Sequence, residues 1–587
     1  MMNKNIQSSL SALLKLPVLV LLLMAFAYSP DAASQTWGNP KPEGSDSLNY
    51  VLTEMARGAA LKGTNGITLG PDGYLYVASV LGQEIVVMDR ENGTIVKRLG
   101  KALGIKSPDD LVFGPDGSLY WTDLLVGEVG RMTPDGLVTK QWVAAGVNPI
   151  AFSPDGRLFV ALDFQGDGLY ELDPALVEPP RPIIVSTPEK PYPLGFLNAF
   201  GFGPDGHLYG PLFAAGLVIR VDVGNPGDPV STDPFTDGTI QTIGSGFQNP
   251  ASAKFGPDGN LYVLDQTGEV FKIDTPTGEK TLFTTLEPGL DNMVFDAKGT
   301  LYITNADEGW VVRVLSGGQS RTISPGGMIA PSGLAVLAGP EGGDKLYVAD
   351  LFRLRQFNGR SGKQEHVDKG FLVPKEKSSS LTLPMNVSTD GNHLLVSSWF
   401  SGAVQVWDPR AQKVLEHYDM AAPVAAIRFG DDILVSDVGL GGVVRASDHS
   451  MILPIDNTTI FAPGGLATDG ETVWVADWGS GTIMQIGFEG DTPNTPVVLA
   501  SGLKNPEGLA FDHAGGLVVV ESGAARLSRI DLSTGEVTTM VEDLELSAPG
   551  LEGMPPTWIF DGVAMGQSGD IYVSGGGSNI IYRVSRE

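Results

Sequence analysis

The sequence predicts an all-β protein made of two tandem six-bladed β-propellers with four-stranded antiparallel blades. Three observations lead to this prediction: a recurring hairpin motif, twelve copies of it, and a composition rich in turn-forming residues. The chain has 587 residues, including 76 Gly and 41 Pro, a larger share than is usual for these two residue types. Because 42% of the residues are hydrophobic, the excess indicates many turns in a globular protein rather than a disordered chain.

The recurring motif is GPDG, or a degenerate form of it, between two short apolar strands. Clear copies include ITLGPDGYLYVAS from Ile67, LVFGPDGSLYWTD from Leu111 and AKFGPDGNLYVLD from Ala253. Pro presets φ and Gly accepts a conformation that other residues resist, so each copy forms a tight hairpin. A third strand and a poorer fourth follow, and such units about every 45 residues are typical of propeller blades. A β-sandwich or β-solenoid is the alternative.

The twelve copies have to be divided between rings, because propellers close with about four to eight blades. We expect a first six-bladed ring at 49–317 and a second at 318–587. Each ring would begin with the outer strand that completes its own last blade, NYVLTEM at 49–55 and SRTIS at 320–324. The alternative is a discontinuous arrangement, in which the first strand of the chain closes the last blade.

The N-terminal residues 1–33 are expected to be a signal peptide. Lys4 and Lys15 precede the apolar run LPVLVLLLMAFA, which ends at Ala27. This run is shorter than the ~20 residues that a stable membrane-spanning helix needs, and it has signal-peptide proportions. We therefore expect an exported protein, periplasmic or extracellular, with no membrane anchor after signal cleavage; a short uncleaved anchor is the alternative. Residues 34–48 are expected to be a linker.

Charge and composition exclude several classes of function. The 39 Lys and Arg face 68 Asp and Glu, a net charge of −29, and nucleic-acid binding needs a basic surface instead. The chain has no Cys, which excludes thiolate nucleophiles and zinc–thiolate sites. The six His lie in or beside hairpin turns or outside the repeats, so a histidine–metal site is not expected. No GxSxG or GxxxxGK[ST] motif occurs, so serine hydrolases and P-loop enzymes gain no support.

The best-placed polar residues lie at the start of each blade's first strand. That strand is nearest the ring axis, so the residue seven positions before the Asp of PDG is predicted to reach the channel mouth. In the first six copies this position holds Asn65, Asp109, Asn148, Asn198, Ala251 and Asp291, and Asp110 and Asn292 follow two of them. In the other six it holds Ser332, Met385, Ala425, Gly464, Glu507 and Asp561.

Carboxylates and amides around one axis are hard oxygen ligands, which suit Ca²⁺ or another divalent metal. Without a cation, clustered carboxylates raise one another's pKa. The alternative is that an Asn or Asp before a hairpin bonds only to its local backbone. We expect a metal or polar-ligand site in the first ring and this local role in the second. Asp residues that end second strands, such as Asp123, Asp163 and Asp265, are expected to form hydrogen bonds between blades.

These repeats, with Asp or Asn at the channel mouth, resemble the gluconolactonase and senescence-marker-protein superfamily, which includes paraoxonases and strictosidine-synthase-like proteins. Individual blades are also similar to NHL repeats and to streptogramin lyase. The resemblance implies one catalytic divalent metal, usually Ca²⁺, in a six-bladed ring. It implies that Asp109 and Asp110 in SPDDLVF, and Asp291 and Asn292 in LDNMVF, are the paired ligand residues. Asn148 and Asn198 would add amide oxygens, and Asn65 is a further candidate ligand from its position.

The sequence departs from this superfamily in two ways. The order of the acids around the ring differs, since Asn65 lies between Asp291 and Asp109. An opening acidic residue is missing from the first ring, whereas Glu507 in PEGLAF and Asp561 in FDGVAM resemble family motifs in the second. We therefore keep Glu507 and Asp561 as second-ring candidates.

The expected function is that of a metal-dependent hydrolase acting on a small-molecule lactone or ester. A bound metal would act as a Lewis acid, and Asp109 or Asp291 would be the catalytic base. One alternative is a non-catalytic NHL-like scaffold that binds an extracytoplasmic protein, peptide or saccharide, because propellers host many functions. The other is a lyase that acts on a cyclic ester.

Overall fold

The computed structural model describes residues 50–339, 342–351, 353–370, 380–381, 383–456, 458, 460–546 and 559–587. The predicted signal peptide at 1–33 and the predicted linker at 34–48 lie outside these residues. Strands dominate, and the helical elements in the described chain are short 3₁₀ turns such as Lys101–Leu103 and Ser522–Ala524. Within this part of the chain, no helix has the length and apolarity needed to cross a membrane. The prediction of an all-β fold is confirmed.

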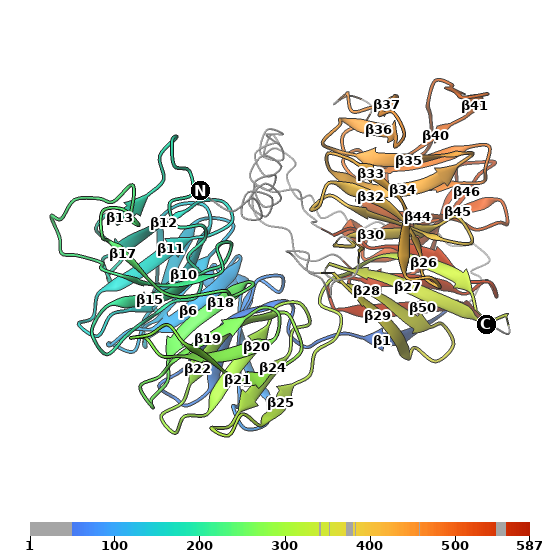
Figure 1. Cartoon of the computed structure of the whole chain (residues 1–587). Coiled ribbons are helices and arrows are strands. Elements are labelled where there is room, and N and C mark those ends of the chain that lie inside the picture. Colours follow the sequence, from blue (N-terminus) through green and yellow to red (C-terminus); the bar gives the residue numbers. More distant parts are fainter. Residues whose placement is uncertain are drawn as a thin grey trace. The chain divides into compact units, whose positions relative to one another are not determined.

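The described chain forms two compact units, and each is built from four-stranded antiparallel sheets (Figure 1). Unit 1 is Ala59–Ile329, and unit 2 combines the residues that end at Gly58 with Ala330–Glu587. In unit 1 the sheets are β2 (Thr64–Leu69), β3 (Leu75–Ser79), β4 (Glu84–Met88) and β5 (Ile95–Leu99); β6 (Pro108–Phe113), β7 (Leu119–Asp123), β8 (Glu128–Met132) and β9 (Val138–Trp142); β10 (Val147–Phe152), β11 (Leu158–Leu162), β12 (Gly168–Leu172) and β13 (Arg181–Val185); β14 (Gly201–Phe202), β15 (Leu208–Leu212), β16 (Leu217–Val221) and β17 (Ile240–Ser245); β18 (Pro250–Phe255), β19 (Leu261–Asp265), β20 (Glu269–Ile273) and β21 (Lys280–Thr285); β22 (Leu290–Phe295), β23 (Leu301–Asn305), β24 (Val311–Val314) and β25 (Ser320–Ser324).

Unit 2 repeats this plan. Its sheets are β26 (Pro331–Ala338), β27 (Asp344–Asp350), β28 (Arg353–Asn358) and β29 (Gln364–Lys369); β30 (Asn386–Thr389), β31 (Leu394–Ser398), β32 (Ala403–Asp408) and β33 (Lys413–Asp419); β34 (Pro423–Phe429), β35 (Asp432–Asp437), β36 (Gly442–Arg445) and β37 (Met451–Pro454); β38 (Pro463–Thr468), β39 (Val473–Asp477), β40 (Thr482–Ile486) and β43 (Val497–Ser501), with the hairpin β41 (Phe488–Glu489) and β42 (Thr492–Pro493) inserted; β44 (Pro506–Phe511), β45 (Gly516–Glu521), β46 (Arg526–Asp531) and β47 (Val537–Val541); β48 (Val563–Met565), β49 (Ile571–Gly575), β50 (Ile580–Arg586) and β1 (Tyr50–Arg57).

The sheets of each unit follow one another around a closed cycle, as propeller blades do. In unit 1 the first strands of successive sheets lie side by side, and the last of them, β22, returns to β2. In unit 2 the same cycle closes between β48 and β26. Because the first strand of every sheet faces its neighbours in this cycle, the residues at its start surround one axis.

The expected boundary between the halves is wrong, and the discontinuous alternative is correct. β1 pairs antiparallel with β50 from Tyr50↔Arg586 to Arg57↔Ile580, so it closes the last blade of unit 2. β25 belongs to unit 1, where it pairs with β24. A tight turn at Gly318 leads β24 directly into β25, and β1 covers the edge of β50 that would otherwise be open.

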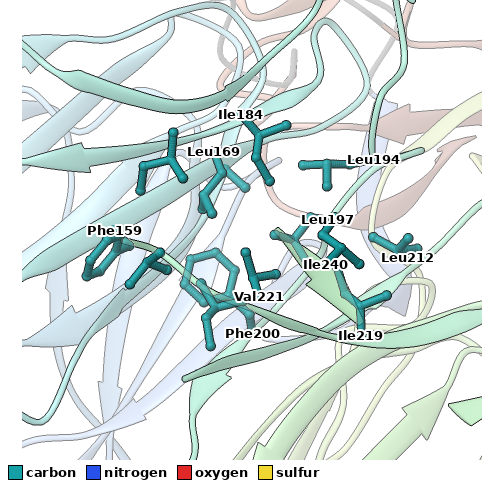
Figure 2. Close-up of a cluster of buried hydrophobic side chains, with 14 of the residues drawn as sticks. Phe159, Leu169, Ile184, Leu194, Leu197, Phe200, Leu212, Ile219, Val221 and Ile240 are labelled. Atoms are coloured by element: carbon teal, nitrogen blue, oxygen red, sulfur yellow. The ribbon is translucent and has the colours of Figure 1, made fainter. Parts of the chain in front are cut away.

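Buried aliphatic and aromatic side chains fill the space between neighbouring blades. Figure 2 shows the cluster between the third and fourth sheets of unit 1, where Phe159 on β11 and Leu169 on β12 pack with Phe200 and Ile219. All four side chains are at most 1% exposed. Their burial accounts for the alternating apolar pattern of the repeats, because each strand of a blade presents every second residue to a neighbouring blade.

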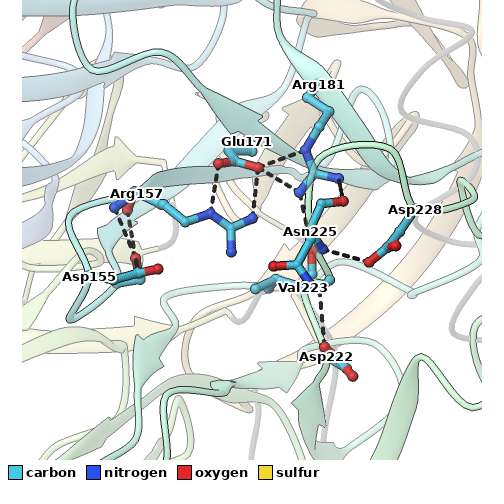
Figure 3. Close-up of polar contacts among 10 residues, drawn as sticks. Asp155, Arg157, Glu171, Arg181, Asp222, Val223, Asn225 and Asp228 are labelled. Carbon is cyan, nitrogen blue, oxygen red and sulfur yellow. Dashed lines mark hydrogen bonds and ion pairs between the residues drawn. The ribbon is translucent and has the colours of Figure 1, made fainter.

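An ion-pair network ties a long connection of the fourth blade to the third. Glu171 on β12 accepts two 2.8 Å hydrogen bonds from Arg157 and a 2.7 Å bond from Arg181 Nε (Figure 3). Arg181 Nη2 also donates to Val223 O, which follows β16. Both guanidinium groups hold the pKa of Glu171 below its usual value. The network fixes the start of the connection between β16 and β17.

Candidate functional site

The predicted channel residues of unit 1 lie where the first strands are bulged. Pairing between β6 and β7 jumps from Pro108↔Asp123 to Leu111↔Trp121, which leaves Asp109 and Asp110 outside the regular ladder. The same jump surrounds Asn65 on β2, Asn148 on β10, and Asp291 with Asn292 on β22. A bulge redirects side chains that a regular strand would send to alternate faces. These bulges therefore allow two consecutive polar residues to serve one site.

Three blades are joined directly at this point. Asn292 Nδ2 on β22 donates a 3.0 Å hydrogen bond to Asp110 Oδ1 on β6, and β2 lies between these two strands. Thr304 Oγ1 donates to Asn65 O at 2.6 Å. A Cβ atom at Gly66 would lie 2.6 Å from Asp109 O, so a side chain at this position would push β2 away from β6. The strand starts carrying Asn65, Asp109–Asp110 and Asp291–Asn292 therefore lie together.

The structure adds a residue that the sequence analysis missed. Lys254 on β18 donates a 2.7 Å hydrogen bond from Nζ to Asn292 Oδ1. Its stem passes β14, where a Cβ on Gly201 would lie 3.5 Å from Lys254 Cγ. The signal was present in the repeats: the position before the aromatic residue of AKFGPDG holds Thr, Val, Ala, Gly or Val in the other five copies of the first half. Lys254 is the one charged residue at this position in the six copies, and this difference indicated that its side chain has a role of its own.

The carboxyl groups of this site are strongly perturbed. Burial, and then the charge of Asp110, raise the pKa of Asp291 to about 8. Burial, followed by the charge of Asp291, raises the pKa of Asp109 well above its usual value. Burial also lowers the pKa of Lys254, against the opposing effect of Asp110 and Asp291. Asp291 therefore lies close enough to Asp109 for its negative charge to disfavour ionisation of Asp109.

Some of the predicted ligand side chains already take part in hydrogen bonds within the chain, and the others are available to a ligand. Asp110 accepts bonds from Leu111 N, Ile150 N and Asn292, and Asn292 and Asn198 accept from the backbone N–H of the next residue. Asn148 faces Asp163, whose pKa it lowers in part. The side chains of Asp109, Asp291 and Asn65 make no hydrogen bond to the residues that the structure describes.

This available set fits a divalent cation. Two carboxylates and an amide are oxygen donors of the kind that Ca²⁺ prefers, and three carboxyls (Asp109, Asp110, Asp291) against one ammonium (Lys254) leave two negative charges when all are ionised. Among the described residues, no group of three or more His, Asp or Glu side chains is arranged to hold one metal. A cation held here would therefore need an amide oxygen as well as carboxylates, and Asn65 is the candidate.

The second-ring candidates form a different environment. Glu507 and Asp561 are both fully buried, and Asp561 N donates a 2.6 Å hydrogen bond to Glu507 Oε2. Gly576 N donates to Asp561 Oδ1 at 2.6 Å. Burial, and then Asp561, raise the pKa of Glu507 well above its usual value. A Cβ on Gly464 would meet the Phe560 ring at 3.8 Å, so an aromatic ring borders this position. Met385 and Ala425, at the equivalent positions of two other blades, are buried apolar residues.

The Asp residues that end second strands bind within their own blade, and not between blades as expected. Asp123 Oδ1 accepts from Lys106 N and Ser107 N, at 2.9 and 2.8 Å, in the loop that enters β6 of the same sheet. Asp437 and Asp477 do the same for the loops that enter β34 and β38. These residues fasten the entry of the first strand and so hold the channel-mouth residues in place.

No family model and no curated protein matches the chain. Among solved structures, the chain is similar to virginiamycin B lyase from Staphylococcus aureus, with 17% identity, 51% of this chain and 96% of that chain covered, and a TM-score of 0.35. It is also similar to a structure described as a gluconolactonase, with 14% identity, 48% and 96% coverage, and a TM-score of 0.34. The extracellular domain of a system described as one-component, from B. thetaiotaomicron, gives 11% identity, 91% and 82% coverage, and a TM-score of 0.31. Similarities of this size assign no activity, so the function is argued below from the site itself.

Proposed function

We propose that the channel of unit 1 is the active site of an exported, Ca²⁺-dependent hydrolase of a lactone or related ester. The observation that carries the proposal is the pair Asp109 and Asp291. These carboxyls come from different blades, the charge of Asp291 adds to the raised pKa of Asp109, and neither side chain receives a hydrogen bond from the described residues. Burying such groups is costly unless a proton or a cation compensates them.

The chain supplies the parts that ester hydrolysis needs. Asp109, Asp291 and Asn65 would hold the cation, and a bound Ca²⁺ supplies Lewis-acid polarisation of the ester carbonyl. Asp291, which accepts no hydrogen bond from the described residues, would also be the general base for a water beside the cation. It accepts a proton from the attacking water while the water oxygen bonds to the carbonyl carbon. The ester C–O bond then breaks, and the alkoxide takes up the proton to give a hydroxy acid.

Lys254 has a positioning role in this scheme. Its bond to Asn292, together with the Asn292–Asp110 bond, occupies the oxygens next to the Asp109–Asp291 pair. The charge of the Lys254 ammonium therefore offsets that of Asp110. The carboxyl groups of Asp109 and Asp291 remain to bind the cation and to accept the proton of the attacking water.

The test combines binding with turnover. The mature protein, freed of metal by a chelator, is titrated with Ca²⁺ by calorimetry and then assayed on a panel of γ- and δ-lactones in ¹⁸O-labelled water. We expect Ca²⁺ binding that raises the melting temperature, and one ¹⁸O per product. A melting temperature that does not respond to chelator, with no turnover of any lactone, would favour the binding scaffold. An unsaturated product without ¹⁸O would establish the lyase instead.

A further inference from the structure

The loop between β11 and β12 of unit 1 has an arrangement of oxygens that the channel site does not use. Its sequence is Asp163-Phe164-Gln165-Gly166-Asp167-Gly168. Asp163 follows β11, and Gly168 begins β12. Three oxygen-bearing side chains thus alternate along one short loop and are followed by Gly. Loops that wrap around Ca²⁺ have this alternation, because every second residue points to the inside of the turn.

Asp163 differs from its equivalents in the other blades. Asp265, for example, accepts from Gln248 N and Asn249 N at the entry of its blade and from Thr267 N, so both of its oxygens are used. Asp163 Oδ1 accepts from Phe164 N at 2.7 Å, and the side chain of Asn148 faces the same carboxyl and partly lowers its pKa. The entry loop of its own blade contributes an acceptor instead, since Asp163 N donates to Gly146 O. The carboxyl of Asp163 therefore does not bind the N–H groups of the loop that enters its blade, as the carboxyl of Asp265 does.

Three buried acceptors in this loop have no hydrogen-bond partner among the described residues: Asp163 Oδ2, Gln165 Oε1 and Asp167 Oδ1. Asp163 is 0% exposed and Asp167 is 2% exposed. An acceptor that loses water without gaining a donor destabilises the fold, typically by ~1–3 kcal/mol. Three such atoms occur within six residues, so this loop gathers buried oxygens that the described chain leaves without donors.

The rest of the loop is rigidly held, so these oxygens cannot easily turn to solvent. Asp167 Oδ2 accepts from Leu194 N at 2.7 Å and Gly195 N at 2.9 Å, which fixes the carboxyl plane. Phe164 lies 6.2 Å from Phe196 in a stacked arrangement. Burial raises the pKa of Asp163 and that of Asp167 to about 7, and the charge of Asp167 adds to the rise at Asp163.

We propose that this loop binds a divalent metal cation of the Ca²⁺ type through Asp163 Oδ2, Gln165 Oε1 and Asp167 Oδ1. Backbone carbonyls and water would complete the six to eight oxygen ligands that Ca²⁺ takes. Two carboxylates and one neutral amide balance the charge of one divalent ion. The twelfth position of the loop is Pro174, where Ca²⁺ loops of high affinity carry a bidentate Glu, so we expect a dissociation constant of about 10⁻⁴–10⁻³ M, as in extracellular modules. The site shares no residue with the Asp109–Asp291 pair, although the charge of Asp163 raises the pKa values of both Asp109 and Asp291.

The experiment is a Ca²⁺ titration of the chelator-treated full chain by calorimetry, with Tb³⁺ luminescence as a second readout. Tyr170 and Tyr192 are close enough to Asp167 for its charge to raise their pKa values, so they should sensitise a bound Tb³⁺. The variants are Asp163→Asn, Asp167→Asn and, as a matched control, Asp265→Asn. The amide in D167N keeps an oxygen for the N–H groups of Leu194 and Gly195, which guards against misfolding, and circular dichroism checks this for every variant.

We expect D163N and D167N each to lose one Ca²⁺ site and at least tenfold of the tyrosine-sensitised Tb³⁺ signal, while D265N keeps both. D291N should keep this site and lose only the channel site. If D163N and D167N bind Ca²⁺ and Tb³⁺ as the unchanged protein does, the inference is wrong, whatever the channel does. If D163N and D167N each lose a site while D291N binds as much Ca²⁺ as the unchanged protein, the proposed function is at fault and the loop site stands.

Discussion

Lys254 Nζ lies 2.7 Å from Asn292 Oδ1, and this bond brings an ammonium from β18 to the channel end of β22. Asn292 in turn donates to Asp110 on β6. The ammonium of Lys254 thus lies near three carboxyl groups, those of Asp109, Asp110 and Asp291. It balances one of the three negative charges, and the other two equal the charge of one divalent cation.

Removing this ammonium should strengthen cation binding at the channel. In Lys254→Met the positive charge that opposes an incoming cation is lost, so we expect the Ca²⁺ dissociation constant of the channel site to fall about tenfold, equivalent to ~1.4 kcal/mol. Calorimetry measures the change. Lys272→Met is the control, because Lys272 pairs with Asp258 on the outside of its blade. Unchanged or weaker Ca²⁺ binding in K254M would show that the charge of Lys254 does not repel a cation bound in the channel.

The stability of the metal-free protein should fall as pH rises from about 4 to about 8. Asp163 and Asp167, with pKa values of about 7, and Asp291, with a pKa of about 8, keep protons in the folded state that the unfolded chain releases near pH 4. The folded state binds more protons in this window, so the free energy of unfolding decreases with pH.

Urea unfolding in chelator at half-unit pH steps measures this slope. Saturating Ca²⁺ should flatten it, because the cation replaces the protons. The triple variant D163N/D167N/D291N should show a shallower slope without Ca²⁺, because Asp109 and Glu507 also have raised pKa values. A free energy of unfolding that rises with pH across this window, in chelator, would contradict the assignment of protons to these three groups.

The strand β1 should stabilise unit 2 and leave unit 1 unaffected. β1 pairs with β50 along its length, and removing it exposes the edge of the last blade. We expect a variant lacking residues 1–57 to lower the melting temperature of one calorimetric transition by about 5 °C or more, relative to a variant lacking residues 1–48. A loss confined to unit 1 would contradict the discontinuous closure.

Glu507 should be a structural acid without a role in metal binding. Burial, and then Asp561, raise its pKa well above the usual value, so the fold disfavours the charged form, and a glutamine side chain reproduces its shape without the charge. In the Glu507→Gln variant, the amide oxygen can still accept the hydrogen bond from Asp561 N. We expect this substitution to raise the melting temperature at pH 8 by about 2–4 °C and to leave Ca²⁺ stoichiometry unchanged. Loss of a Ca²⁺ site in E507Q would place a metal in unit 2.

The repeats predicted the blades because hairpin chemistry is local. Pro and Gly of the GPDG motif specify a turn without reference to the rest of the chain, and the apolar alternation specifies which faces pack. The prediction that β1 and SRTIS each complete the last blade of the ring that follows them was wrong. β1 pairs with β50, more than 500 residues away, and pairing over such a distance leaves no local signal in the sequence.

The candidate site was predicted by type and only partly by detail. The spacing from PDG located Asp109 and Asp291 at bulged strand starts, since the register of a hairpin is fixed by its turn. It could not tell which oxygens the fold would use, such as that of Asn198, which accepts from Ala199 N. Lys254 was missed because it lies three residues after Ala251, the position that the spacing selects in its blade, and reaches Asn292 on the neighbouring blade. The orphaned oxygens of Asp163 and Asp167 depend on where neighbouring loops place their N–H groups.

The most direct measurement is the initial rate of lactone hydrolysis, at saturating Ca²⁺, of the unchanged protein, D291N and E507Q side by side. Loss of a general base typically costs 10²–10⁴-fold, so we predict such a loss in D291N, an unaltered rate in E507Q, and no hydrolysis in chelator. Equal rates in D291N and the unchanged protein, or hydrolysis that persists in chelator, would contradict the assignment of the active site to the channel of unit 1.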